Sequence, residues 1–186
     1  MLKEPQSLSR TILTGVAAGL TAGAVVGLVD RLTDRLVSKE HKRREKLVRE
    51  DSAHRLAGPY FARKLLGREL SPKQARTAGA VFGISYGIVW GTIYAGLRRT
   101  VPGTSSLMGL PFAVPFFFGC DGTLAPLLGV SPGIRKLPWQ INAKELGNHL
   151  VWTMTAESVH RLLSRVPPTR IDEVLSRVAS LREKSR

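Results

Sequence analysis

Eight glycines at intervals of four residues fall in two uncharged stretches of the chain, 11–29 and 77–97. Glycine inside a water-exposed helix costs about 1 kcal/mol relative to alanine, so this repeat is unfavourable for a soluble helix. In lipid, by contrast, helices associate by close backbone approach along small residues. The repeat therefore predicts two transmembrane helices that pack through glycine faces. Its members are Gly15, Gly19, Gly23 and Gly27 in the first stretch and Gly79, Gly83, Gly87 and Gly91 in the second.

Two further stretches extend the prediction to four membrane helices. Both glycine stretches are close to the ~20 residues that cross ~30 Å of hydrocarbon. A third apolar stretch, 107–128, contains Pro111, Pro115 and Pro126. Because proline removes a backbone donor and kinks a helix, we expect a Pro-kinked span. The fourth stretch, 146–163, is more polar than the others. The predicted fold is an all-α helical transmembrane bundle.

The basic residues are concentrated between the spans. The formal net charge is +14, and half of the 28 Lys and Arg residues lie in 30–76. We expect this basic loop to begin as a charged helical stalk that ends at Gly58-Pro59. We also expect Ser7 or Ser9 to cap the first helix and Ser71 to cap the second, the latter with Gln74 in a capping box.

The sequence thus predicts two parts, a membrane domain, 1–166, and an amphipathic tail helix, 167–186. The tail helix has one apolar face and one basic face. The excess of basic over acidic residues favours the lipid bilayer and its anionic headgroups as partners. A homo-oligomer stays open as an alternative. Nucleic acid is not expected, because aromatic residues are not interleaved over most of the basic region.

Ionisable residues in the third and fourth stretches form the candidate polar intramembrane site: Asp121, His149, Glu157 and His160. One interpretation pairs Glu157 with Arg161 or His160 near the membrane surface. The other makes Glu157 and His149 titratable groups in a polar cavity with Asp121, because ionisable residues at membrane depth commonly mark ion or proton pathways.

Catalytic, metal and cofactor sites are not expected. Gly83-Ile84-Ser85-Tyr86-Gly87 matches the G-x-S-x-G pattern, but that motif needs a strand–turn–helix setting and here falls inside a predicted helix. His149 and His160 are eleven residues apart, about 16 Å along a helix axis, so they cannot share a metal ion.

From Leu137 onward the chain resembles the YagU-like family of bacterial inner membrane proteins. The matching residues are Leu137-Pro138-Trp139, Glu145, Gly147, His149-Leu150-Val151-Trp152, Glu157 and Arg161. The resemblance covers about 25 residues and implies a four-helix, multi-pass protein of the bacterial inner (plasma) membrane, with a link to acid tolerance. It carries over no substrate and no catalytic residue.

The predicted function is non-enzymatic: a membrane protein for acid stress or membrane homeostasis with a polar intramembrane site. The alternative is a structural or assembly protein that recruits anionic lipids or partner proteins through its basic loop and tail. Positive charge concentrates on the cytoplasmic side of membrane proteins. That rule favours three spans with 146–163 at the interface, whereas the family resemblance favours four.

Overall fold

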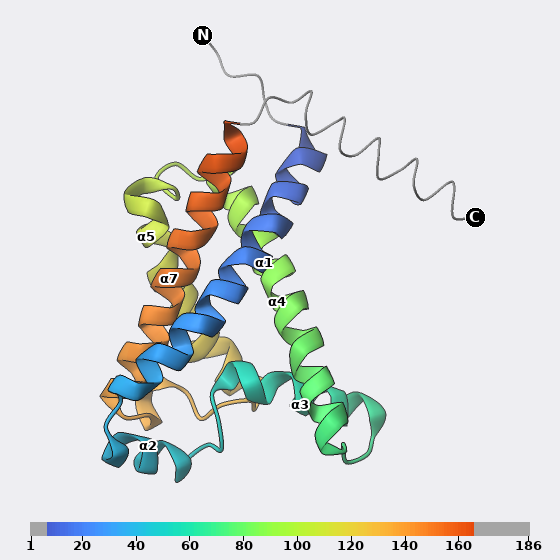
Figure 1. The fold of residues 1–186 in the computed structure, drawn as a ribbon, viewed down its shortest axis with the longest axis vertical. Helices are drawn as coiled ribbons and strands as arrows, with labels where there is room; N and C mark the ends of the chain where they lie inside the picture. Colours follow the sequence, from blue (N-terminus) through green and yellow to red (C-terminus); the bar gives the residue numbers. More distant parts are fainter. Residues whose placement is uncertain (1–6, 166–186) are drawn as a thin grey trace, which may run out of the picture.

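A computed structural model of the chain describes residues 7–165, and this part is helical, with no strand. Four long helical segments run side by side between an upper end, where residue 8 lies, and a lower end (Figure 1). They are α1 (Leu8–Thr33), α4 (Pro72–Thr100), α5 (Leu110–Gly119) with its continuation, and α7 (Trp139–Ser164). Their shared core contains Ala18, Ala22, Tyr94, Phe112, Phe116, Cys120, Trp152 and Ala156.

Three helical segments are long and apolar enough to cross a membrane: Leu8–Leu36, Pro72–Thr100 and Ser106–Leu127. Large apolar side chains such as Ile84, Val89 and Phe118 are exposed on these segments, as expected for helices that face lipid rather than water. The two glycine-rich spans are longer than their uncharged stretches. Ser7 caps α1 through its side chain, and Ser71 forms the predicted capping box with Gln74.

The two glycine-rich helices cross in their upper halves. A side-chain carbon built on Gly15 would lie 2.8 Å from the carbonyl oxygen of Gly91, and one built on Gly19 would collide with the carbonyl of Gly87. At this crossing only glycine lets the two backbones approach so closely. Below it the helices diverge (Figure 1), and Gly23, Gly27 and Gly79 have open space where a side chain would be.

The third apolar stretch contains α5, then a π-helical turn, η3 (Cys120–Leu124), and then α6 (Ala125–Leu127). The hydroxyl of Thr123 donates to the carbonyl of Phe118, five residues earlier, at 3.1 Å. The wider turn thus lies between Pro115 in α5 and Pro126 in α6.

The fourth long helix, α7, is polar on its inner side. Asn148, Thr153, Glu157 and His160 are all less than 10 % exposed, whereas Met154 and Leu162 are 43 % and 60 % exposed. It packs lengthwise against α1 and α5. Part of the low average hydropathy of this helix therefore comes from residues that face protein.

The lower end differs from the expected stalk. The first helix ends at Thr33, and a 3-10 turn, η1 (Asp34–Leu36), leads to two shorter helices, α2 (Lys39–Lys46) and α3 (Ala53–Leu66). The predicted break at Gly58-Pro59 is wrong, because both residues lie inside α3. There Gly58 packs against the backbone of Ala78 and Gly79 on α4, which draws α3 back beneath the bundle.

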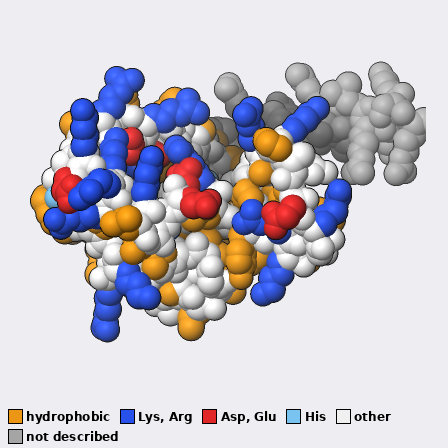
Figure 2. All heavy atoms as spheres, turned by 90° about the horizontal axis from the view of Figure 1, so that it is seen from below, with side chains coloured by type: hydrophobic (Ala, Val, Ile, Leu, Met, Phe, Trp, Pro, Cys, Tyr) orange, Lys and Arg blue, Asp and Glu red, His pale blue; other side chains and the backbone are white. Residues whose placement is uncertain are grey.

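The lower face is basic. Figure 2 shows it from below, with Lys and Arg side chains spread across it. The last connection, which contains η4 (Ile134–Lys136), joins α6 to α7 at the same end. The predicted tail helix, 167–186, lies outside the described residues.

Candidate functional site

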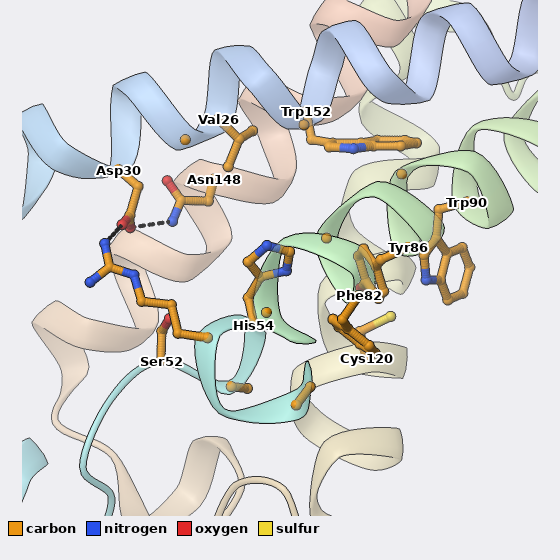
Figure 3. Close-up of a pocket in the computed structure, with 18 of the residues that line it drawn as sticks. Val26, Asp30, Ser52, His54, Phe82, Tyr86, Trp90, Cys120, Asn148 and Trp152 are labelled. Carbon is orange, nitrogen blue, oxygen red and sulfur yellow. Dashed lines mark hydrogen bonds and ion pairs between the residues drawn. The ribbon is translucent and has the colours of Figure 1, made fainter. Parts of the chain in front are cut away.

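A cavity of about 770 Å³ opens where α1 and α4 diverge. Its apolar wall includes Leu20 and Val26 from α1, Phe82 from α4 and Trp152 from α7. The bare backbone at Gly23, Gly27 and Gly79 widens it, because no side chain projects from these positions. The wall also includes His54 on α3 and Ser52, which directly precedes that helix (Figure 3). The volume is typical of pockets that hold small organic molecules.

Aromatic rings form a continuous layer beside the cavity. The ring of Phe116 lies 4.5 Å from Trp90, 5.2 Å from Trp152 and 6.4 Å from Tyr86, measured between centroids. Tyr86 also contacts the ring of His54 at 5.8 Å. Such packing holds flat, polarisable surfaces at one side of the space.

The first polar cluster at the lower end of the cavity is centred on the carboxylate of Asp30. Lys144 lies 3.1 Å from its carboxylate, the side-chain amide of Asn148 donates to it at 3.0 Å, and Arg55 approaches to 3.4 Å. Burial is the largest single effect on the pKa of the Lys144 ammonium and lowers it, but the hydrogen bonds and negative charges of Asp30, Glu145 and Asp34 together outweigh burial and raise that pKa above its usual value. The Asp30 charge is therefore balanced by cations from α3 and α7.

Glu145 is the second carboxylate of this region, and it is also paired. The guanidinium of Arg49, a residue only 6 % exposed, lies 3.0 Å from Glu145 and 2.6 Å from Glu45, and it donates to the Ser131 hydroxyl at 3.4 Å. This buried arginine ties the segment after α2 to α7 and to the loop that precedes α7. Breaking such a pair from one side leaves an uncompensated buried charge.

Asp121 is different from the other carboxylates that line the cavity. Its only ion-pair partner among residues 7–165 is His149, whose Nε2 lies 3.5 Å from Oδ2. The other ring nitrogen of His149, Nδ1, lies 2.9 Å from the carbonyl oxygen of Glu145. A carbonyl oxygen only accepts hydrogen bonds, so we assign the hydrogen of the neutral ring to Nδ1.

Glu157 lies in a separate group at the upper end. Its side chain is fully buried and accepts hydrogen bonds from Tyr94 at 2.8 Å, Arg98 at 2.8 Å and Arg161 at 2.7 Å. The first of the two sequence interpretations, a pairing of Glu157 with Arg161, is the one observed. His160 is 6 % exposed, its ring lies 5.7 Å from that of Tyr94, and no hydrogen-bond partner reaches its Nε2 in the described part of the chain.

The structure thus divides the predicted site in two. Asp121 and His149 meet beside the cavity, whereas Glu157 and His160 lie about two and three helical turns further along α7. Sequence reasoning missed Asp30, Arg49 and His54, because the region after the first uncharged stretch reads as a solvated stalk. A carboxylate one turn after Gly27, at the end of an uncharged run, is the signal that indicates Asp30.

The G-x-S-x-G match does not have the setting that the motif needs. Its central residue, Ser85, lies within α4 and not at a strand–turn–helix junction. No group of three His, Cys, Asp or Glu residues within 7–165 is arranged to hold a metal ion. Comparison with models of protein families, with curated proteins and with solved structures finds no match for this chain. The resemblance to the YagU-like family therefore stays a prediction.

Proposed function

We propose that this chain is a non-enzymatic, multi-pass membrane protein that binds an amphiphilic molecule in the cavity between α1 and α4. The observation that carries the proposal is the cavity itself, about 770 Å³ in volume, with an apolar wall and polar groups at its lower end. A ligand with an apolar body and a polar head matches this division. Such an activity is compatible with the predicted role in membrane homeostasis in a bacterial inner membrane.

The proposed topology has four spans. Four polar residues of α7, Asn148, Thr153, Glu157 and His160, are buried, and the helix packs against α1 and α5, so it presents less polar surface to lipid than its composition suggests. Both ends of the described chain lie at the upper end (Figure 1), and the basic 34–71 segment lies at the lower end. The positive-inside rule then puts the lower face in the cytoplasm. Reporter fusions at residue 165 and within α2 test this; activity of a cytoplasmic reporter at residue 165 would contradict it.

Cys120 offers a direct test of the cavity, because it is the single cysteine of the chain and lines this space. In dodecylmaltoside micelles, monoolein should slow alkylation of Cys120 by N-ethylmaleimide several-fold. Gly23→Leu should abolish this protection, because the new side chain enters the open space of the cavity.

Gly96→Leu is the matched control, because Gly96 also has open space around it but does not line the cavity. Protection should persist in this variant. Equal protection in all three proteins, or none in the unmodified protein, would contradict amphiphile binding at this place.

The basic lower face favours a second function, recruitment of anionic lipid. Arg43, Arg44 and Lys46 on α2 are exposed, and charged side chains near a membrane surface gain about 1 kcal/mol each from anionic headgroups. Nanodiscs rich in phosphatidylglycerol should stabilise the protein relative to phosphatidylcholine nanodiscs, and triple substitution of these residues by Gln should remove most of the difference. An unchanged difference would exclude α2 as the contact.

A further inference from the structure

The three carboxylates that line the cavity differ in their partners. Asp30 is neutralised by Lys144 and Arg55, and Glu145 by Arg49. Asp121 has no lysine or arginine partner within residues 7–165, although its side chain is only 16 % exposed. An ionised carboxylate is expensive to bury without a compensating charge. Asp121 therefore needs a proton or a cation that the protein does not itself supply as Lys or Arg.

His149 can hold that proton. Because Nδ1 donates to the carbonyl of Glu145, the neutral ring presents the Nε2 lone pair to the Asp121 carboxylate at 3.5 Å. Two acceptors facing each other repel, whereas one proton on either partner makes the contact attractive. With no ligand bound, the pair is therefore favourable when it holds a single proton.

The surroundings of this pair suit a positively charged head. The faces and edges of Phe116, Tyr86 and Trp152 line the same space, and aromatic rings attract organic cations. The Oδ1 atom of Asn148, a residue 8 % exposed on the cavity wall, has no hydrogen-bond partner among the described residues.

The other charged groups around the Asp121–His149 pair do not cancel the preference of the cavity for a positively charged head. Arg31 and Arg55 line the cavity with exposed side chains, and Arg55 also lies near Asp51 and Asp30. Arg49 is shared between Glu45 and Glu145. His54 and Tyr86 are the titratable groups that α3 and α4 present to the cavity.

On the basis of the proposed function, we infer that the cavity takes an amphiphile with a cationic head, an ammonium on an apolar body, which replaces the proton of the Asp121–His149 pair. The charges balance: one organic cation enters, one proton leaves to water, and the carboxylate keeps one positive partner. The source is either a free lipophilic cation or the ammonium of a phosphatidylethanolamine headgroup, because both present the same group.

Two probes of the same shape and opposite charge test the inference. After subtraction of binding to empty phosphatidylglycerol nanodiscs, whose anionic headgroups attract the cation by themselves, tetraphenylphosphonium should bind the protein, and tetraphenylborate should bind at least tenfold more weakly. Because one proton is displaced, the affinity for tetraphenylphosphonium should rise with pH, by up to about tenfold per unit. Equal binding of both ions, or binding independent of pH between 5 and 8, would overturn the inference.

Substitutions of Asp121 and His149 test whether this pair causes the cation binding and its pH dependence. Asp121→Asn should lose cation binding at least tenfold together with its pH dependence, and Asp121→Glu should retain both. His149→Gln should keep the binding but flatten the pH profile near neutrality. Unchanged binding in Asp121→Asn would also overturn the inference. If this variant does not fold, the comparison of the two probes on the unmodified protein still decides.

Two further measurements separate the outcomes. Weaker tetraphenylphosphonium binding in phosphatidylethanolamine than in phosphatidylglycerol nanodiscs identifies the headgroup as a competing occupant, and equal binding identifies a free cation. If monoolein still protects Cys120 while neither ion binds, amphiphile binding stands and the cationic head is wrong. If monoolein gives no protection, the proposed function itself fails.

Discussion

The upper and lower halves of α1 and α4 carry the same four-residue glycine repeat in opposite surroundings. In the upper half Gly15 and Gly19 press against the backbone of α4. In the lower half Gly23 and Gly27 face open space, and the cavity lies beside them. A missing side chain thus brings two helices together at one level and leaves room at another. The difference shows that a regular spacing of small residues does not by itself predict where two helices are in contact.

The largest expected effect comes from the same substitution made one turn apart. Gly19→Leu should destabilise the protein by about 3 kcal/mol or more, because its side chain would collide with the carbonyl of Gly87. Gly23→Leu should change the free energy of unfolding by less than about 0.5 kcal/mol. Unfolding in dodecylmaltoside–SDS mixtures measures both. Similar losses in the two variants would erase the distinction between the halves.

The polar groups of the two ends extend the comparison. Glu157→Gln should cost about 2 kcal/mol, because the buried side chain loses charge-assisted hydrogen bonds to Arg98 and Arg161, whose side chains are 28 % and 47 % exposed. Asp121→Asn, the matched control, should cost about 1 kcal/mol or less, since its only ionic contact within residues 7–165 is to His149 at 3.5 Å. The same unfolding assay ranks them, and a reversed order would mean that the lower end is the more tightly neutralised.

A third glycine contact tests how the lower half is closed. Gly58→Ala on α3 should destabilise by about 2 kcal/mol, because the added methyl would meet the carbonyl of Ala78 and the backbone of Gly79. We also expect faster proteolysis between α2 and α3 in this variant. Gly67→Ala, at the end of the same helix, is not a neutral control, since Gly67 has a φ of 64°. Arg63→Ala at a solvent-accessible α3 position is preferable, and equal loss there would contradict a specific role for Gly58.

The smallest effect is a gain. Gly27→Ala should stabilise the protein by about 0.5 kcal/mol, because alanine favours the helix and no atom lies within 4 Å of the new methyl group. Differential scanning fluorimetry should register a small upward shift of Tm. A decrease would indicate that the wall of the cavity closes around Gly27 in the membrane.

Much of the helical architecture is predictable from local signals that the sequence carries. The apolar runs and the caps at Ser7 and Ser71 correspond to the observed helices α1 and α4. The conformation of 30–57 is not predictable in this way, because its charges suit a solvated helix as well as the turn at Asp34 that the fold adopts. At that turn the Asp34 carboxylate pairs with Lys42 at 2.6 Å and also with Lys144 at 3.3 Å. Lys144 is 110 positions away, and no local pattern reveals that contact.

The candidate site is predictable in its members but not in its grouping. Asp121 and His149 meet because α5 and α7 pack with one particular register. Glu157, eight residues after His149, is about 12 Å further along the same axis and faces Arg98 instead. Periodicity assigns a residue to a helix face, but it does not say which neighbour reaches that face. The cavity is equally invisible in the sequence, because it results from the angle at which α1 and α4 cross.

The π-helical turn η3 contains one residue more than an α-helical turn would need. Asp121 lies within this wider turn, directly after Cys120. The place of the one cavity carboxylate that has no lysine or arginine partner among residues 7–165 therefore depends on a local widening of the helix, and Thr123 is one of the residues that form it.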